Sequence, residues 1–164
     1  MTRAVLSIGS NLGDRLDYLR LAVDEFGASV EAVSPVYETA PWGVTDQPEF
    51  LNAVLIVNHP EVDAWGWLRA GQRREQTAQR VREQHWGPRS LDVDVITVDG
   101  ATSEDDELRL PHPHAHRRAF VLAPWLDLDT DAELPGHGKV AELLDALPAD
   151  ERSGVRRRDD LSLP

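Results

Sequence analysis

Hydrophobic and polar residues follow two different periods in the first half of the chain. Segments in which apolar and polar residues alternate, rich in β-branched and aromatic types, predict strands. Segments in which apolar residues recur every three or four positions, such as Leu16, Leu19, Val23 and Phe26 before Gly27, predict helices. The elements expected here are strands at 3–9, 29–38 and 50–57, helices at 13–26 and 60–79, and loops at 39–49 and 81–89.

The second half begins with a strand and continues with shorter elements. Residues 91–98 alternate and are β-branched, and Asp99-Gly100 predicts a tight turn directly after them. The last ten residues, 155–164, contain three consecutive arginines and end in proline, so we expect a loose tail. The remaining expected elements are a short strand at 108–110 and helices at 116–126 and 138–147.

The order of these elements predicts the fold class. Strand, helix, two strands, helix and strand form a βαββαβ series, which favours a mixed or antiparallel sheet covered by helices. We therefore expect an α/β (α+β) protein with a ferredoxin-like core. The length of 164 residues is that of one domain, 1–164, large enough to bury its own core.

Two carboxylates within the strand at 91–98 are the first candidates for chemistry. Side chains two positions apart on a strand share a face, so Asp92 and Asp94 emerge roughly 7 Å apart. They repel each other unless a cation lies between them, and Mg²⁺ favours one or two carboxylates together with phosphate oxygens. Arg80, Arg82 and Arg89 precede the strand, and guanidinium groups bind phosphate bidentately. Although an isolated Asp-x-Asp is usually a solvated strand face, this combination indicates a metal–nucleotide site.

Composition narrows the possible partners and the location. The formal net charge of −12 provides no basic field for a nucleic acid, although it allows a small polyanion. The chain has no cysteine, so thiolate metal sites and disulfides are excluded. It has neither a signal-peptide pattern nor an apolar run of roughly 20 residues. We expect a cytoplasmic protein without membrane contact, which acts as a monomer on small molecules.

Three alternating histidines offer a different metal site. His112, His114 and His116 would share one face of a strand, as zinc ligands do in some hydrolases. Pro111 and Pro113 interrupt a regular ladder, and the arginines that follow repel a dication. We therefore favour His112 and Arg118 as contacts for nucleotide phosphates.

Two further segments could serve a ligand or only the fold. Gly9 to Gly13 lacks the Gly-Lys-Ser/Thr ending of a phosphate-binding loop, so we expect it to join the first strand to the first helix, with Ser10 or Asn11 as the helix cap. Phe50, Asn52 and Trp42 combine flat apolar surfaces with a side-chain amide, and Phe50 and Asn52 share a strand face. Such a set can hold a flat heterocycle or belong to the core.

Five segments, in order, resemble the 6-hydroxymethyl-7,8-dihydropterin pyrophosphokinase family. The most specific is Trp-Gly-Pro-Arg-Ser-Leu-Asp-Val-Asp at 86–94. The others are Ile-Gly-Ser-Asn-Leu-Gly at 8–13, Tyr-Glu-Thr-Ala-Pro-Trp-Gly at 37–43, Phe-Leu-Asn-Ala at 50–53, and Leu-Pro-His-Pro at 110–113 with Arg-Ala-Phe-Val-Leu at 118–122. The resemblance runs from Ser7 to about Leu126 and is weak beyond Asp127.

This resemblance implies an ATP- and Mg²⁺-dependent diphosphokinase of folate biosynthesis that transfers pyrophosphate from ATP to the pterin hydroxymethyl oxygen and releases AMP. It implies that Asp92 and Asp94 hold two Mg²⁺ ions and that the loops at 39–49 and 81–89 close over the site. The implied catalytic residues are Arg80, Arg89, Asp92 and Asp94. The implied ATP contacts are Gln72, Glu75, Arg82, Trp86, His112 and Arg118, and the implied pterin contacts are Thr39, Trp42, Phe50, Asn52 and Phe120.

Two other classes of protein remain as alternatives. A zinc-dependent hydrolase would use the three histidines, and stoichiometric zinc in the purified protein would favour it. An ACT-like regulatory module would bind a small ligand on a similar fold, but it would need neither paired metal carboxylates nor an arginine lid.

Overall fold

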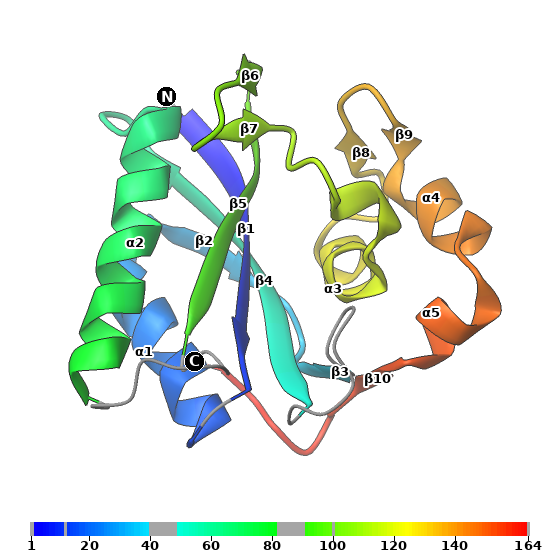
Figure 1. The fold of residues 1–164 in the computed structure, drawn as a ribbon, viewed down its shortest axis with the longest axis horizontal. Helices are drawn as coiled ribbons and strands as arrows, with labels where there is room; N and C mark the ends of the chain where they lie inside the picture. Colours follow the sequence, from blue (N-terminus) through cyan, green and yellow to red (C-terminus); the bar gives the residue numbers. More distant parts are fainter. Residues whose placement is uncertain (1, 12, 40–48, 82–90, 100, 164) are drawn as a thin grey trace.

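The computed structural model describes residues 2–11, 13–39, 49–81, 91–99 and 101–163. A central sheet separates two helical layers, with α1 and α2 on one face and α3 and α4 on the other (Figure 1). The elements of the sheet are β1 (Thr2–Ser10), β2 (Val30–Val33), β3 (Tyr37–Thr39), β4 (Phe50–His59), β5 (Asp92–Val98) and β10 (Val155–Arg157). The helices are α1 (Arg15–Phe26), α2 (Ala64–Val81), α3 (Ala119–Leu128), α4 (Val140–Ala146) and α5 (Ala149–Ser153), with short 3-10 turns η1 (Gly27–Ser29) and η2 (Ala115–Arg117).

The strand order is β10-β3-β4-β1-β5, and β2 also pairs with β4. Every pairing in this sheet is antiparallel. The first strand therefore lies between the third and the fourth strands of the βαββαβ series, as the ferredoxin-like arrangement requires, which confirms the predicted fold class. Two small hairpins, β6 (Ser103–Glu104) with β7 (Arg109–Leu110) and β8 (Glu133–Leu134) with β9 (Gly138–Lys139), lie outside the sheet.

Strand alternation builds one core on each face of the sheet. Leu6 and Leu55 point toward α1 and α2, where they pack with Leu19 and Trp67. Neighbouring positions on the same strands point toward α3 and α4 and form a second core, whose members include Val54, Ile56, Ile96, Leu122 and Trp125. The α3-side core leaves one end of its sheet face uncovered by aliphatic residues, and the candidate site lies at that end.

Several predicted boundaries shift. The strand expected at 29–38 is interrupted after Val33, because the Ser34 hydroxyl accepts the N–H of Val54 and Pro35 has no N–H of its own. The helix expected at 116–126 is a 3-10 turn followed by α3, and 138–147 begins as a strand before α4. The expected cap at Ser10 or Asn11 is wrong, since Asp14 accepts the N–H of Asp17 at the start of α1.

The expectation of a loose tail is wrong for the arginine-rich segment. Residues 155–157 form β10, which pairs with β3 in the register Val155 with Thr39 and Arg157 with Tyr37. The N–H of Arg158 then donates to the carbonyl of Val36 at 2.8 Å. A sheet edge that needed a hydrogen-bonding partner finds it in this segment.

Candidate active site

Three neighbouring strands present polar or small residues to the α3 side at the same level of the sheet. On β1, Gly9 pairs with Asn52 of β4 on one side and with Asp92 of β5 on the other. Ser7 pairs with Asp94 in the same way. The alternation that buries Ile8 and Val93 on the opposite face therefore places these groups in rows across the sheet.

A pocket with a volume of about 160 Å³ lies over these rows. Two further elements complete it, because Thr39 comes from β3 and the last contacts come from the N-terminal end of α3. Its lining comprises Ser7, Gly9, Thr39, Phe50, Asn52, Asp92, Asp94, Arg118 and Phe120. Seven of the residues predicted to be functional are thus brought together, from sequence positions as distant as 39 and 120.

The carboxylate end of the pocket also holds a half-buried cation, the guanidinium of Arg118. An Arg118 Nη1 lies 4.0 Å from Asp94 Oδ2, and its guanidinium lies 5.5 Å from the centre of the Phe120 ring. Burial lowers the pKa of Arg118, and the charges of Asp94 and Asp92 oppose that shift. Two partly exposed carboxylates on one face are an oxygen-ligand set that suits Mg²⁺, which takes its other ligands from water or substrate phosphates.

The opposite end of the pocket is fixed by a buried amide. Asn52 Nδ2 donates to Thr39 Oγ1 at 2.7 Å, and both residues are almost fully buried. Gly9 makes room for this amide, since a Cβ at that position would lie 2.8 Å from Asn52 Oδ1 and 3.4 Å from Phe50 Cδ1. The Asn52 amide and the Phe50 and Phe120 rings give this end the flat apolar surfaces and edge hydrogen bonds that a heterocycle requires.

His112 lines an adjoining groove, which it shares with Asp94 and Arg109. Burial, followed by the nearby Arg118 charge, lowers the pKa of His112 to about 4, so the imidazole is neutral at physiological pH. Its Nδ1 accepts the N–H of His114, which leaves the proton on Nε2 as a donor.

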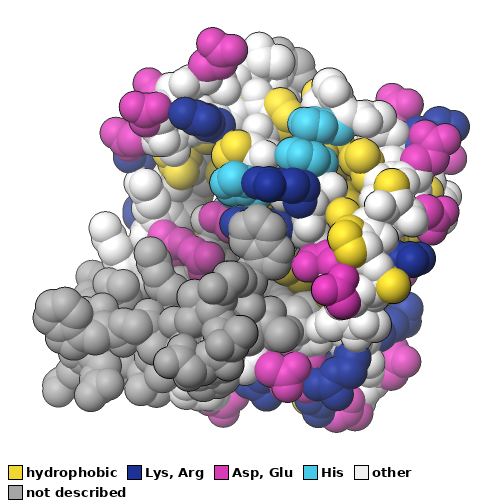
Figure 2. Space-filling model, turned by 45° about the vertical axis from the view of Figure 1, so that its right-hand side comes forward, with side chains coloured by type: hydrophobic (Ala, Val, Ile, Leu, Met, Phe, Trp, Pro, Cys, Tyr) yellow, Lys and Arg dark blue, Asp and Glu magenta, His cyan; other side chains and the backbone are white. Residues whose placement is uncertain are grey.

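The three histidines of the hydrolase alternative have different surroundings. The ring of His114 contacts Arg117, and the ring of His116 stacks on His137 with centroids 4.1 Å apart. Figure 2 shows histidine and arginine side chains gathered on this face of the molecule. Within the described ranges, no group of three or more His, Cys, Asp and Glu residues is arranged to hold a metal ion.

The predicted ATP contacts on α2 lie beside β5. Glu75 accepts the N–H of Val93 at 2.8 Å, and Gln72 accepts from Arg69 at 3.0 Å. Gly71 allows this close packing, since a Cβ there would lie 2.9 Å from Val93 Cγ1. Arg80 belongs to α2 by its backbone, whereas Trp42, Arg82, Trp86 and Arg89 lie outside the described residues.

Some residues of the site carry no obvious chemical signal in the sequence. Ser7 and Gly9 line the pocket only because they alternate with the buried Ile8. Their place could have been inferred by extending the strand pattern of 3–9 to its polar face. Glu38, which precedes Thr39 and contacts three arginines, had no such signal.

Comparison with known proteins identifies relatives over most of the chain. The family model for 7,8-dihydro-6-hydroxymethylpterin-pyrophosphokinase (HPPK) matches residues 5–130. The 2-amino-4-hydroxy-6-hydroxymethyldihydropteridine pyrophosphokinase of Mycobacterium leprae is 53% identical over 169 residues, which cover 95% of this chain and 88% of that protein. The enzyme of the same name from Mycobacterium tuberculosis is 48% identical over 168 residues, covering 95% and 89%.

A solved structure supports the fold. A Plasmodium falciparum HPPK-DHPS triple mutant with STZ-DHP superposes with a TM-score of 0.70 at 12% identity. The match covers 95% of this chain but only 46% of that longer one. The family model and the relatives together show that the chain belongs to the 7,8-dihydro-6-hydroxymethylpterin-pyrophosphokinase family.

Proposed function

We propose that this protein transfers pyrophosphate from ATP to the hydroxymethyl oxygen of 6-hydroxymethyl-7,8-dihydropterin, with AMP as the second product. The observation that carries the proposal is the pocket itself, in which a carboxylate pair on β5 and an aromatic-amide slot on β4 lie on either side of β1. Family membership supports the reaction class, and the two ends of the pocket support a separate site for each substrate.

The pterin is assigned to the end formed by Thr39, Asn52, Phe50 and Phe120. Asn52 can bond the polar edge of the ring system, while the two phenyl rings supply flat apolar contacts. Trp42 is assigned to the same substrate from the family pattern. In this arrangement the hydroxymethyl group extends along the row toward Gly9 and Asp92.

The triphosphate is assigned to the carboxylate end. Arg118 and the Nε2–H of His112 would donate to its oxygens, as would Arg80, Arg82 and Arg89 from the segment before β5. Guanidinium donors neutralise the charge that develops as the pyrophosphoryl group moves. Gln72, Glu75 and Trp86 complete the proposed ATP site.

Asp92 and Asp94 would hold the Mg²⁺ ions, two by the family pattern, and bound Mg²⁺ screens phosphate charge and lowers the pKa of a coordinated hydroxyl. The hydroxymethyl oxygen forms a bond to the β-phosphorus, the bond from that phosphorus to the oxygen of the α-phosphate breaks, and AMP leaves. The hydroxyl proton passes to solvent. The residues of the chain contribute alignment and electrostatic stabilisation, which suffice for phosphoryl chemistry.

Neither a membrane nor a nucleic acid has a part in this proposal. None of the helices in the described ranges has the length and apolar character that a membrane span requires. The net charge of −12 is unfavourable for a polyanionic polymer. We propose that the protein acts in the cytoplasm as a monomer, which sedimentation and cell fractionation can test.

The deciding experiment follows nucleotide products by chromatography. The purified protein is incubated with ATP, Mg²⁺ and 6-hydroxymethyl-7,8-dihydropterin, with matched reactions that omit the pterin or contain a chelator. The proposal expects AMP and pterin diphosphate in equal amounts, only in the complete reaction. Formation of ADP in place of AMP, or an AMP yield that does not depend on the pterin, would refute it.

A further inference from the structure

Two acidic residues flank the pterin end of the pocket. Glu38 directly precedes Thr39 on β3, and Glu49 directly precedes Phe50 at the start of β4. Thr39 and Phe50 are register partners, and Asn52 reaches Thr39 through its side chain. Thr39, Phe50 and Asn52 form the wall at the pterin end of the pocket. Any group that holds Glu38 and Glu49 together therefore also sets the distance between β3 and β4 in this wall.

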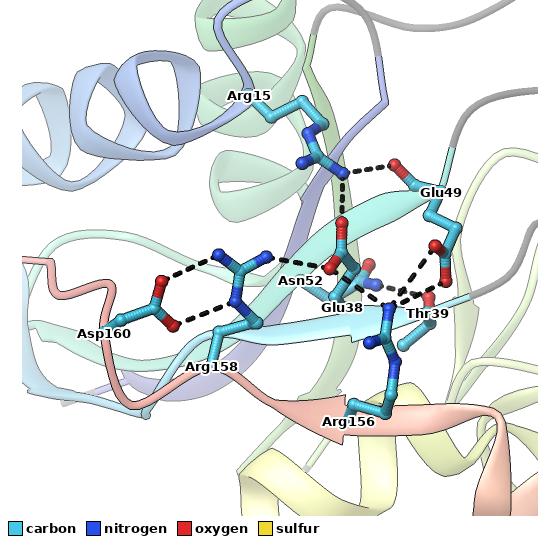
Figure 3. A network of polar contacts seen from close by, with 8 residues as sticks. All are labelled: Arg15, Glu38, Thr39, Glu49, Asn52, Arg156, Arg158 and Asp160. Atoms are coloured by element: carbon cyan, nitrogen blue, oxygen red, sulfur yellow. Dashed lines mark hydrogen bonds and ion pairs between the residues drawn. The ribbon is translucent and has the colours of Figure 1, made fainter.

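Arginines from two distant elements bridge these acidic residues, as Figure 3 shows. Arg15 Nη1, on α1, donates to Glu38 Oε2 at 2.7 Å and to the Glu49 carbonyl at 2.8 Å. Arg156 Nη2, on β10, lies 3.2 Å from Glu38 Oε1 and 3.3 Å from Glu49 Oε1. Each bridge thus uses a single guanidinium nitrogen to join β3 to β4.

A third arginine also compensates the negative charge of Glu38. Arg158 Nη1 donates to Glu38 Oε1 at 2.8 Å, while its other nitrogens bond Asp160. The Glu38 side chain is only 11% exposed, so its charge depends on these partners. Burial acts to raise the pKa of Glu38, but the hydrogen bonds from Arg15 and Arg158 outweigh it and leave the pKa lowered.

Backbone hydrogen bonds between β10 and β3 also hold the same wall. The three residues of β3 would form a short edge strand if β4 were their only partner, and short strands with one partner are marginal. β10 supplies the other partner and pairs Val155 with Thr39 itself. The C-terminal segment therefore contacts the pocket wall through both its backbone and its arginines.

We propose that Arg15, Arg156 and Arg158 form an arginine clamp that positions the pterin-binding wall, and so act as positioning residues for one substrate only. This inference rests on the proposed function for its substrate. The clamp contacts Thr39, Phe50 and Asn52 through Glu38 and Glu49, whereas Asp92 and Asp94 lie two strands away on β5. Loss of the clamp loosens the pterin end and leaves the carboxylate end in place.

The test measures the two substrates separately by calorimetry, using the full chain with Mg²⁺. One titration uses a non-hydrolysable ATP analogue, and the other uses the dihydropterin in the presence of that analogue. Arg156→Ala is the main variant, since Arg156 is 58% exposed and its loss does not open the core. We expect the Kd for the pterin to rise about tenfold and the Kd for the analogue to change by less than about twofold.

Three further variants distinguish positioning from general destabilisation. Arg152→Ala removes the same charge from an exposed position on the neighbouring α5 and should leave both Kd values unchanged. Val140→Ala, in the α3-side core away from the pocket, should lower the melting temperature without affecting pterin affinity. Arg156→Lys keeps the charge and should restore part of the pterin affinity.

The outcomes separate this inference from the proposed function. If the wild-type protein binds no pterin, the proposed function fails, and the inference fails with it. If the wild type binds pterin and Arg156→Ala binds it equally well, the clamp has only a structural role and the inference alone is overturned. An equal loss of affinity for both ligands, or an equal loss of pterin affinity in Val140→Ala, would also overturn it.

Discussion

Replacing Gly9 by alanine tests whether the pocket depends on the close approach of two strands. The added Cβ would lie 2.8 Å from Asn52 Oδ1 and 3.4 Å from Phe50 Cδ1. The first distance is shorter than real Cβ atoms adopt, so the Asn52 amide must move. It cannot move without strain, because its nitrogen is bonded to Thr39 at 2.7 Å and the residue is 3% exposed.

The expected magnitude follows from these contacts. Adding a methyl group to a filled interior destabilises a protein by about 1–3 kcal/mol, and the loss of a buried hydrogen bond contributes about 1 kcal/mol more. We therefore expect Gly9→Ala to lower the free energy of unfolding by about 2–4 kcal/mol. The same displacement removes an edge contact for the pterin and narrows its slot, which should weaken pterin binding by about 2 to 3 kcal/mol, or roughly a hundredfold.

The assay combines chemical denaturation with calorimetric titration of the dihydropterin. Gly66→Ala is the matched control, since its Cβ would also lie 2.8 Å from a neighbouring atom, Val62 Cγ1, but outside the pocket. We expect Gly66→Ala to bind the pterin as the wild type does. Unchanged pterin affinity in a folded Gly9→Ala protein would show that Asn52 is not held as described, and would refute the reasoning.

Three other changes test separate parts of the site. Asp94→Asn should lower AMP formation at least about a hundredfold while leaving the circular dichroism spectrum unchanged; turnover within a few fold of wild type contradicts its metal role. Because burial and Arg118 lower the pKa of His112 to about 4, only the unfolded chain gains this proton between pH 6.5 and 4. This group should contribute a loss of stability of at most about 3 kcal/mol over that range, and His112→Gln should remove that contribution; an NMR titration midpoint near 6.5 for His112 refutes the account. The lowered pKa of Glu38 stabilises the folded protein at pH values above 4.5, the ordinary pKa of the group, and this stability is lost as the pH falls through the folded-state pKa. Glu38→Gln should therefore make the free energy of unfolding depend less steeply on pH in acid denaturation.

Strand periodicity predicted which side chains share a face of the sheet, because a two-residue repeat determines the face that each side chain occupies. Asp92 and Asp94 share a face for that reason, as do Phe50 and Asn52, and both pairs line one pocket. That the two pairs lie at the same height across the sheet was not predictable from either strand alone, since it depends on the register between the strands. Gly9 sets that level by pairing with both Asn52 and Asp92.

Long-range electrostatic partners were beyond local sequence patterns. An arginine run near a chain end resembles a solvated tail, and nothing near it indicates Glu38, which lies 118 residues before Arg156. The predicted position of the helix cap was also wrong. Asp14 caps α1 because the helix begins at Arg15, which puts Asp14 in the N-cap position. Ser10 and Asn11 have equally suitable side chains, so residue type alone did not locate the cap.

The pairing of Gly9 with Asn52 on one side and Asp92 on the other fixes the distance between the two ends of the pocket. Adjacent strands are about 4.8 Å apart, so the backbones that carry Asn52, proposed to bind the pterin, and Asp92, proposed to bind the metal, are separated by two such intervals, roughly 10 Å. Backbone hydrogen bonding, not side-chain packing, determines this interval, so changes in the surrounding loops leave it intact. A single rigid inhibitor that occupies both ends should therefore carry a linker matched to two strand spacings.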